Sequence, residues 1–343
     1  MASLESGSAS YLSSLPPATT QIIYGLKLWS LKLLSSFGLA SVRLFTTTPL
    51  PLRPSIIKEY PCRPGLANRI FVPRSHRPGE LLPLYLDLHG GGFALLDAQY
   101  DDEFCAVLAN KFNILVASIE YRKSPTSKFP EPTYDVVAIS NAIIEDEALP
   151  IDKSRVVLGG FSAGGNLCLS AAQVPELKSK INGVIPWYPL TDFTLSPAEK
   201  QSSRPYRNAK DMDDFKDWGP IWEWAYVRPG QNLGDPLLSV RYATKDKLPK
   251  WVYMVGAEYD MLANEGRDLM VDLAGLTEVG KEKEFYGFEK DTYKWTLARG
   301  VRHGFTHDMM DNPGAEVVVV NQKRVKELVD DLGSWLFKGP FAA

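Results

Sequence analysis

The chain has 343 residues, of which 45% are hydrophobic and 23% charged, and its formal net charge at pH 7 is −3. This length suits one large domain with an added cap, or two small domains, and the composition is that of a globular protein. The near-neutral charge lacks the basic excess of nucleic-acid-binding proteins. Cys62, Cys105 and Cys168 show no metal-ligand spacing and no disulfide framework. We therefore expect reduced thiols, a cytoplasmic location and no bound metal.

The N-terminal region has two parts. Residues 1 to about 20 are rich in Ser, Ala, Thr and Pro, and we expect them to be poorly ordered. An apolar stretch follows at 22–45, but Lys27, Lys32 and Arg43 interrupt it, so it is too charged to span a membrane. We predict an amphipathic helix that covers an apolar surface, with peripheral membrane contact or a homodimer contact as the alternatives.

From about residue 83, short apolar runs alternate with longer mixed segments. Strands are predicted at 84–88, 114–119, 155–158, 251–255 and from 184, and helices at 101–112, 131–147, 163–173, 265–279 and 317–337. This alternation predicts an α/β fold, with a mostly parallel sheet that has helices on both faces. Residues 195–235 are charged, aromatic and punctuated by proline. They interrupt the alternation of predicted strands and helices, so we predict an excursion of the chain out of the sheet.

The motif Gly160-Phe161-Ser162-Ala163-Gly164 lies between an apolar run at 156–158 and a predicted helix. A serine hydroxyl becomes a nucleophile when a sharp strand-to-helix turn exposes it beside a base. Small residues on both sides of the serine allow such a turn without steric clash. The motif and its context therefore predict Ser162 as the nucleophile.

A glycine-rich loop, His89-Gly90-Gly91-Gly92, follows the predicted strand at 84–88. Glycines allow the backbone to approach a substrate closely, and N–H groups at a strand end can stabilise a developing oxyanion. The loop precedes the serine motif, where an oxyanion loop is expected. We predict that this loop contributes to an oxyanion hole.

The base should be a histidine late in the chain. The four histidines are His76, His89, His303 and His307. His76 lies in a polar segment before the sheet, and His89 belongs to the glycine loop. We favour His303, which precedes a glycine in a polar segment, and keep His307 as the alternative.

The acid that orients the base should follow a strand between the serine and the histidine. Asp260 follows the predicted strand at 251–255 and precedes His303. Glu258, Asp235 and Asp192 are the alternatives, and Glu258 is close enough in sequence to serve in the same place.

With these residues placed, the chain resembles the hormone-sensitive-lipase-like carboxylesterases, also described as the α/β-hydrolase fold-3 group, over roughly residues 80–335. The motifs that carry the resemblance are His89–Phe93, Tyr121-Arg122 with Pro125 and Phe129-Pro130, Gly160–Gly165, Asp235–Leu237, Asp260–Leu262 and His303–Phe305. The resemblance implies an α/β-hydrolase fold and a triad of Ser162, Asp260 and His303. It also implies an oxyanion hole formed by the amides of Gly91, Gly92 and Ala163, and a structural role for His89 in organising the glycine loop.

The resemblance further implies a helical cap. Residues 1–55 and 195–235 would form the cap, and residues 56–194 and 236–343 the catalytic domain. The sequence departs from the family pattern at Phe161, Lys123-Ser124, Thr126 and Met261, and none of these changes removes a catalytic group. The segment 282–302 is also longer than usual, with an added charged piece at about 289–294.

The implied activity is that of a serine carboxylesterase that acts on a small-molecule ester through an acyl-enzyme and needs no cofactor. An aromatic-rich cap favours a bulky apolar or aromatic ester or lactone, such as specialised metabolism supplies. Phe93, Phe161, Trp218 and Trp222 are the candidate substrate contacts. An acyltransferase or cyclising enzyme is the alternative. A non-catalytic receptor is less favoured, because His303 is present.

Overall fold

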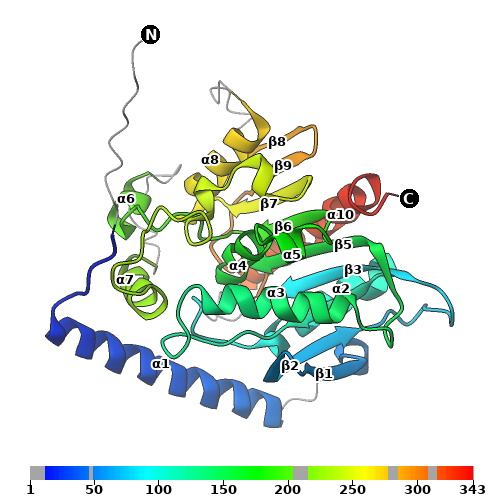
Figure 1. Cartoon of the computed structure of the whole chain (residues 1–343), viewed down its shortest axis with the longest axis horizontal. Coiled ribbons are helices and arrows are strands. Elements are labelled where there is room, and N and C mark those ends of the chain that lie inside the picture. The colour runs from blue at the N-terminus through cyan, green and yellow to red at the C-terminus, as the bar shows by residue number, and fades with distance from the viewer. Residues whose placement is uncertain (1–11, 46–48, 204–214, 277–284, 308–314, 343) are drawn as a thin grey trace.

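The computed structural model describes residues 12–45, 49–203, 215–276, 285–307 and 315–342 (Figure 1). Its centre is a nine-stranded sheet in the order β1-β2-β4-β3-β5-β6-β7-β9-β8. The strands are β1 Ile56–Tyr60, β2 Arg63–Phe71, β3 Leu82–Leu88, β4 Leu115–Ile119, β5 Ile151–Phe161, β6 Gly183–Trp187, β7 Trp251–Ala257, β8 Gly287–Lys290 and β9 Tyr293–Ala298.

The α-helices lie mainly between the strands along the chain. They are α1 Ala18–Phe45, α2 Asp102–Phe112, α3 Glu131–Ile144, α4 Ala163–Ala171, α5 Pro175–Lys178, α6 Pro197–Ser202, α7 Phe215–Tyr226, α8 Ala263–Ala274 and α10 Ala315–Lys338. Strands β3 to β7 and β9 pair in parallel, whereas β1, β2 and β8 pair antiparallel at the two edges of the sheet.

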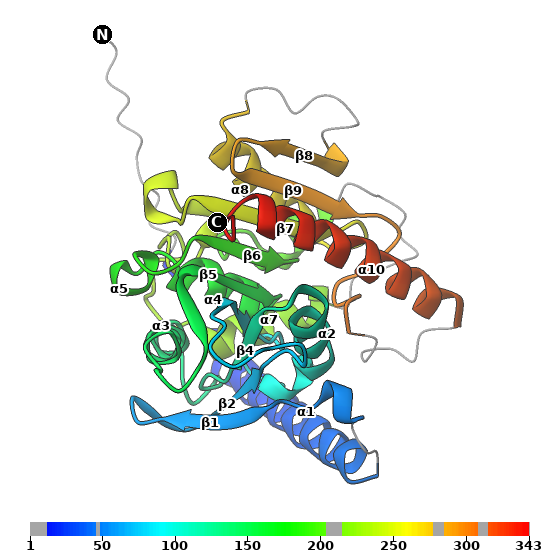
Figure 2. The same ribbon diagram turned by 90° about the vertical axis from the view of Figure 1, so that its right-hand side faces the viewer.

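The central strands are buried on both faces. Helices α3, α4 and α8 pack against one face, for example through Ile139, Leu167 and Leu269. Helices α2 and α10 cover the other face, where Leu108 and Leu332 are fully buried (Figure 2). Near-continuous apolar runs such as 84–88 are typical of parallel strands covered on both sides. The predicted α/β fold with a mostly parallel sheet is therefore confirmed.

The strands at and next to the two edges of the sheet, β1, β2, β9 and β8, are the part that sequence patterns missed. Strands β1 and β2 form a hairpin with mixed polarity, and Pro64 and Gly65 lie inside β2. The charged segment predicted as an added piece at about 289–294 forms the end of β8, the turn at 291–292 and the start of β9. β1 and β8 are the edges of the sheet, and they and their neighbours β2 and β9 are only partly buried, so all four lack the apolar continuity that revealed the central strands.

Helix α1 begins at Ala18, four residues before the predicted start. Residues 1–11 of the segment expected to be poorly ordered lie outside the described residues. The backbone of residues 12–13 pairs with that of residues 231–232, where Ser13 N donates to Gln231 O at 2.9 Å. Helices α1 and α6 both contact α7, so the N-terminal region and the excursion at 195–235 meet in space. None of the described helices combines the length and hydropathy needed to cross a membrane.

Candidate active site

Ser162 lies at the sharp turn between β5 and α4, with a backbone φ of 54°. A positive φ is strained for a residue with a side chain, and this turn holds it in place through a hydrogen bond from Ser162 N to Trp187 O of 2.9 Å. A Cβ atom on Gly160 would lie 2.5 Å from Gly164 O, and one on Gly164 would lie 2.1 Å from Leu88 O. Both glycines are therefore required by close backbone packing.

His303 connects Ser162 with Asp260. Its Nε2 lies 2.8 Å from Ser162 Oγ, and its Nδ1 lies 2.7 Å from Asp260 Oδ2. Asp260 is fully buried, and its other carboxylate oxygen accepts a 2.9 Å hydrogen bond from Leu262 N. A carboxylate accepts the proton on Nδ1, which leaves Nε2 free to accept from the serine hydroxyl. The arrangement is that of a nucleophile, a base and an acid that orients the base.

The other candidates of the sequence analysis lie elsewhere. His307 Nε2 lies 2.9 Å from Oδ1 of the buried Asp101, so His307 belongs to a second histidine–aspartate contact behind the serine turn. The alternative acids accept hydrogen bonds from backbone N–H groups: Glu258 from Gly300 at 2.7 Å, Asp192 from Thr194 at 2.7 Å and Asp235 from Leu237 at 3.0 Å. Asp260 is the acid of this set that contacts His303.

The glycine loop lies directly against the serine turn. A Cβ atom on Gly90 would lie 3.2 Å from Phe161 O. Gly91, Gly92 and Phe93 have φ values of 106°, 58° and 63°, so the loop follows a left-handed path that glycine favours. Gly92, Ser162 and Ala163 line the same pocket. These positions suit the predicted oxyanion hole, in which the amides of Gly91, Gly92 and Ala163 would donate.

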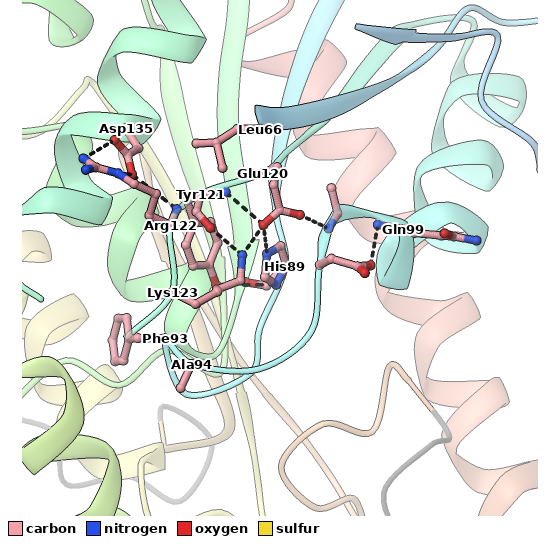
Figure 3. A network of polar contacts seen from close by, with 12 residues as sticks. Leu66, His89, Phe93, Ala94, Gln99, Glu120, Tyr121, Arg122, Lys123 and Asp135 are labelled. Atoms are coloured by element: carbon pink, nitrogen blue, oxygen red, sulfur yellow. Dashed lines mark hydrogen bonds and ion pairs between the residues drawn. The ribbon is translucent and has the colours of Figure 1, made fainter. Parts of the chain in front are cut away.

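A polar network that the sequence analysis did not foresee supports this loop from behind (Figure 3). His89 is fully buried, with Nδ1 2.7 Å from Gly90 O, and its ring stacks on Tyr121 at a centroid distance of 4.4 Å. The Tyr121 hydroxyl donates to His89 O at 2.8 Å. Burial and the nearby Lys123 charge lower the pKa of His89. These contacts suit the structural role that the resemblance implies for His89.

Glu120 and Lys123 form the charged centre of the network. Lys123 Nζ donates to Glu120 Oε1, and it lies 3.9 Å from the centroid of the Tyr121 ring. Glu120 Oε2 accepts a 2.9 Å hydrogen bond from Ala98 N, which lies beyond the glycine loop in the chain. Burial alone would raise the pKa of Glu120, but His89 and Lys123 lower it to about 2. The carboxylate therefore contacts Ala98 N beyond the loop, and its Oε1 lies 3.7 Å from His89 Nε2 at the start of the loop.

Helix α1 reaches the same loop through Lys32. Lys32 Nζ donates to Ala94 O at 2.8 Å and to Ser124 O at 2.9 Å. Ser124 N in turn donates to Phe93 O at 2.9 Å. Burial, with a smaller effect of the Lys123 charge, lowers the pKa of Lys32. Lys32 interrupts the apolar stretch in the sequence, and the structure explains this interruption, because Lys32 attaches α1 to the carbonyls of Ala94 and Ser124.

The pocket beside Ser162 is mainly apolar. Its lining includes Phe93, Phe193, Leu195, Trp222 and Met261, together with the charged residues Lys200 and Glu223. Lys200 is neutralised by Glu265, with Nζ 2.6 Å from Oε2. A second pocket of about 260 Å³ shares Asp192, Leu195, Lys200 and Met261 with the first and adds Arg241, Tyr242 and Asn264. The two pockets thus share a wall, and the second has the more polar lining.

Two of the four predicted substrate contacts, Phe93 and Trp222, line the pocket beside Ser162. Trp218 stacks on Trp222 at a centroid distance of 5.6 Å and supports it. Phe161 is only 1% exposed, and its ring packs edge-on against Phe104 at 4.8 Å. The Phe161 side chain points into the core rather than into the pocket, because neighbouring residues on a strand face opposite sides of the sheet. The predicted substrate contact of Phe161 is not supported.

The described residues hold no group of three or more His, Cys, Asp and Glu side chains arranged to bind a metal ion. The three cysteines are free thiols, with Cys62 exposed and Cys105 and Cys168 buried.

The chain is similar to known proteins in sequence and in fold. A family model described as alpha/beta hydrolase fold matches residues 85–297. Neutral cholesterol ester hydrolase 1 of Mus musculus is 35% identical over 152 residues, which are 40% of this chain and 36% of that protein. An arylesterase of Saccharolobus solfataricus is 33% identical over 191 residues, which are 53% of this chain and 59% of the relative. The matches to these relatives therefore span less than two thirds of their length.

A solved esterase of Pyrobaculum calidifontis, in its monoclinic form, is similar over nearly the whole chain. The TM-score is 0.69 at 22% identity, and the match covers 94% of this chain and 98% of the esterase. This likeness shows the fold. The family model spans more than half of the chain, from β3 to β9, and it includes the serine turn and Asp260. The protein therefore belongs to the α/β-hydrolase fold-3 family, the hormone-sensitive-lipase-like hydrolases.

Proposed function

We propose that this protein is a serine carboxylic ester hydrolase that works through an acyl-enzyme intermediate. The observation that carries the proposal is the chain of contacts from Ser162 Oγ to His303 Nε2 at 2.8 Å and from His303 Nδ1 to Asp260 at 2.7 Å. The relatives named as an arylesterase and a neutral cholesterol ester hydrolase support the same reaction class.

In the first half-reaction, His303 Nε2 takes the hydroxyl proton as Ser162 Oγ attacks the ester carbonyl. Asp260 stabilises the imidazolium that forms. The amides of Gly91, Gly92 and Ala163 would donate to the oxyanion, and one such donor contributes about 3 kcal/mol to transition-state stabilisation. His303 then gives its proton to the leaving alcohol as the carbonyl re-forms. Water then attacks the acyl-enzyme by the same steps, with His303 again as the base, and the carboxylic acid product is released.

We infer that the substrate is a bulky apolar or aromatic ester or lactone, as specialised metabolism supplies. The apolar lining around Ser162, with Phe93 and Trp222, favours such a group near the nucleophile. The adjoining pocket of about 260 Å³ accommodates a further, more polar part of the molecule. Helices α1, α6 and α7 would form the cap that closes over both.

The test is hydrolysis of p-nitrophenyl butyrate and p-nitrophenyl octanoate by the wild type and by Ser162→Ala, His303→Gln and Asp260→Asn. We expect the Ser162 and His303 variants to lose at least about 10⁴-fold in kcat. Ser334→Ala, on the exposed side of α10, is the matched control and should keep full activity. Adding an alcohol acceptor separates hydrolysis from acyl transfer, because transfer would yield a new ester.

A fluorophosphonate probe gives a readout that does not depend on the substrate. The probe should label the wild type and the Ser334 control, and it should not label Ser162→Ala. Labelling that persists in a folded Ser162→Ala protein, or full activity of that variant, would refute the proposal.

A further inference from the structure

Four residues beyond His303, a second histidine lies against a second buried aspartate. His307 Nε2 is 2.9 Å from Oδ1 of Asp101, which is fully buried directly before α2. Neither residue belongs to the proposed triad or lines the pocket beside Ser162. A buried contact between an imidazole and a carboxylate contributes little net stability, because burial removes the hydration of both groups. The surroundings of the pair indicate another role.

His307 closes the turn that follows the proposed base. Its backbone N donates to Gly304 O at 2.9 Å, so the segment from Gly304 to His307 is a closed turn directly after His303. His307 Nδ1 lies 2.8 Å from Thr306 Oγ1 within the same turn. The contact of His307 with Asp101 therefore fixes the far end of this turn to the start of α2.

Tyr188 links this turn to the ring of the proposed base. Its hydroxyl contacts Thr306 Oγ1, and its ring packs against the His303 ring at a centroid distance of 4.8 Å and an interplanar angle of 62°. Tyr188 directly follows β6, a central strand of the sheet. The turn is therefore held by the end of β6 on one side and by Asp101 on the other.

The His307 ring also lies behind the nucleophile. It packs edge-on against Phe161, which directly precedes Ser162, at a centroid distance of 4.7 Å, and it stacks on Tyr100 at 4.8 Å. The same imidazole thus contacts the strand end that carries the nucleophile and belongs to the turn that follows the base. Proton transfer requires Ser162 Oγ and His303 Nε2 to stay within hydrogen-bond distance, and His307 joins the supports of both.

We propose that His307 and Asp101 are a positioning pair, which holds the turn after His303 against the serine turn and thereby sets the contact between Ser162 and His303. This inference rests on the proposed function and goes beyond it, since it assigns a role to residues outside the triad. Asp101 acts through His307, so replacing either residue should have the same effect on catalysis as replacing both. The loss should fall on kcat and leave KM nearly unchanged, because the pocket lining is untouched.

The experiment compares Asp101→Ala and His307→Phe with Asp102→Ala on p-nitrophenyl butyrate. The adjacent Asp102 is the matched control, because it is 7% exposed but pairs with Arg69 of β2, whose Nε lies 2.5 Å from Asp102 Oδ1. We expect Asp101→Ala and His307→Phe each to lower kcat at least about tenfold, with KM changed by no more than about twofold. Asp102→Ala should lower the melting temperature and keep the wild-type kcat.

The double variant Asp101→Ala/His307→Phe tests whether the two residues act through one contact. Its kcat should be no lower than that of the slower single variant. Additive losses in the double variant would overturn the proposal. A wild-type kcat in Asp101→Ala, or an equal loss of kcat in Asp102→Ala, would overturn it as well.

A readout that needs no turnover separates this inference from the proposed function. Proton–nitrogen NMR spectra report the histidine rings, and the signals of His303 are those lost in His303→Gln. Asp101→Ala should shift these signals, and Asp102→Ala should leave them in place. Unchanged His303 signals in Asp101→Ala would overturn the positioning role even if the wild type hydrolyses esters. An inactive wild type that shows the expected shifts would contradict the proposed hydrolysis and support the positioning of His303.

Discussion

The contact between Gly92 and Trp222 allows a quantitative test of how the cap touches the glycine loop. A Cβ atom on Gly92 would lie 2.7 Å from Cδ2 of the Trp222 indole and 3.0 Å from its Cε3. Optimal contact between carbon atoms is about 3.5–4.0 Å, so Gly92→Ala requires the ring or the loop to move by about 1 Å. The left-handed φ of 58° adds a backbone cost of about 1–2 kcal/mol for alanine.

These two effects act on the amide that we assign to the oxyanion hole. Trp222 is backed by Trp218, so the loop rather than the indole is expected to yield. A misplacement of about 1 Å at a reacting centre costs on the order of 10²-fold. We therefore expect Gly92→Ala to lower kcat/KM on p-nitrophenyl butyrate by about 10²- to 10³-fold, mainly through kcat, since the lost interaction forms only in the transition state.

A double-variant cycle separates the steric part from the backbone part. Adding Trp222→Ala removes the ring that the new methyl group would meet, and it should restore at least about tenfold of the kcat/KM lost by Gly92→Ala. Gly65→Ala is the matched control, since Gly65 has a φ of 79° and a methyl group added there would meet no atom within 4 Å. It should lower stability without lowering kcat. Additive losses in the double variant, or a Gly92→Ala enzyme of wild-type kcat, would refute the steric account.

Two more predictions concern the supports of the loop. Glu120→Gln should lower the free energy of unfolding by up to about 3 kcal/mol above pH 5. The pKa of Glu120 is about 2, below its usual 4.5, so its contribution is fully present above pH 4.5 and is lost as the pH falls towards 2. Urea unfolding from pH 3 to pH 7 measures this, and a difference that does not shrink with acid would contradict it. Lys32→Met should lower kcat with little change in KM, because the Ala94 and Ser124 carbonyls lose their donor. Steady-state kinetics and thermal unfolding of the variant test this. A lower melting temperature with an unchanged kcat would show that the role of Lys32 is purely structural.

Local patterns predicted the central fold, and they also led to the residues of the candidate site. Ser162, His303 and Asp260 belong to short segments whose residue types follow from the chemistry. The apolar parts of β3, β5 and β7 lead into the glycine loop, Ser162 and Asp260, whereas His303 follows β9, a strand that the patterns did not predict. In contrast, β1, at one edge of the sheet, and its neighbour β2 have mixed polarity, so no periodic pattern distinguishes them from loops.

The contacts that sequence reasoning missed are long-range and depend on the direction of single side chains. Lys32 and Ala94 are 62 residues apart, and no local pattern indicates that a lysine within an apolar stretch donates to a distant carbonyl. The Phe161 prediction failed for a related reason. Adjacency to Ser162 suggested a shared pocket, but the alternation of side chains along a strand turns Phe161 towards the core.

The cap elements reach the glycine loop at two points. Trp222 of α7 lies against Gly92, and Lys32 of α1 holds Ala94 two residues further along the chain. Because α1 and α7 also pack on each other, a shift of these helices would move the glycine loop at both contacts. In the proposed function, admission of substrate past α1 and α7 is thus linked to the geometry of the oxyanion hole. Lys32→Met, which removes the contact of α1 with the glycine loop, should therefore alter kcat.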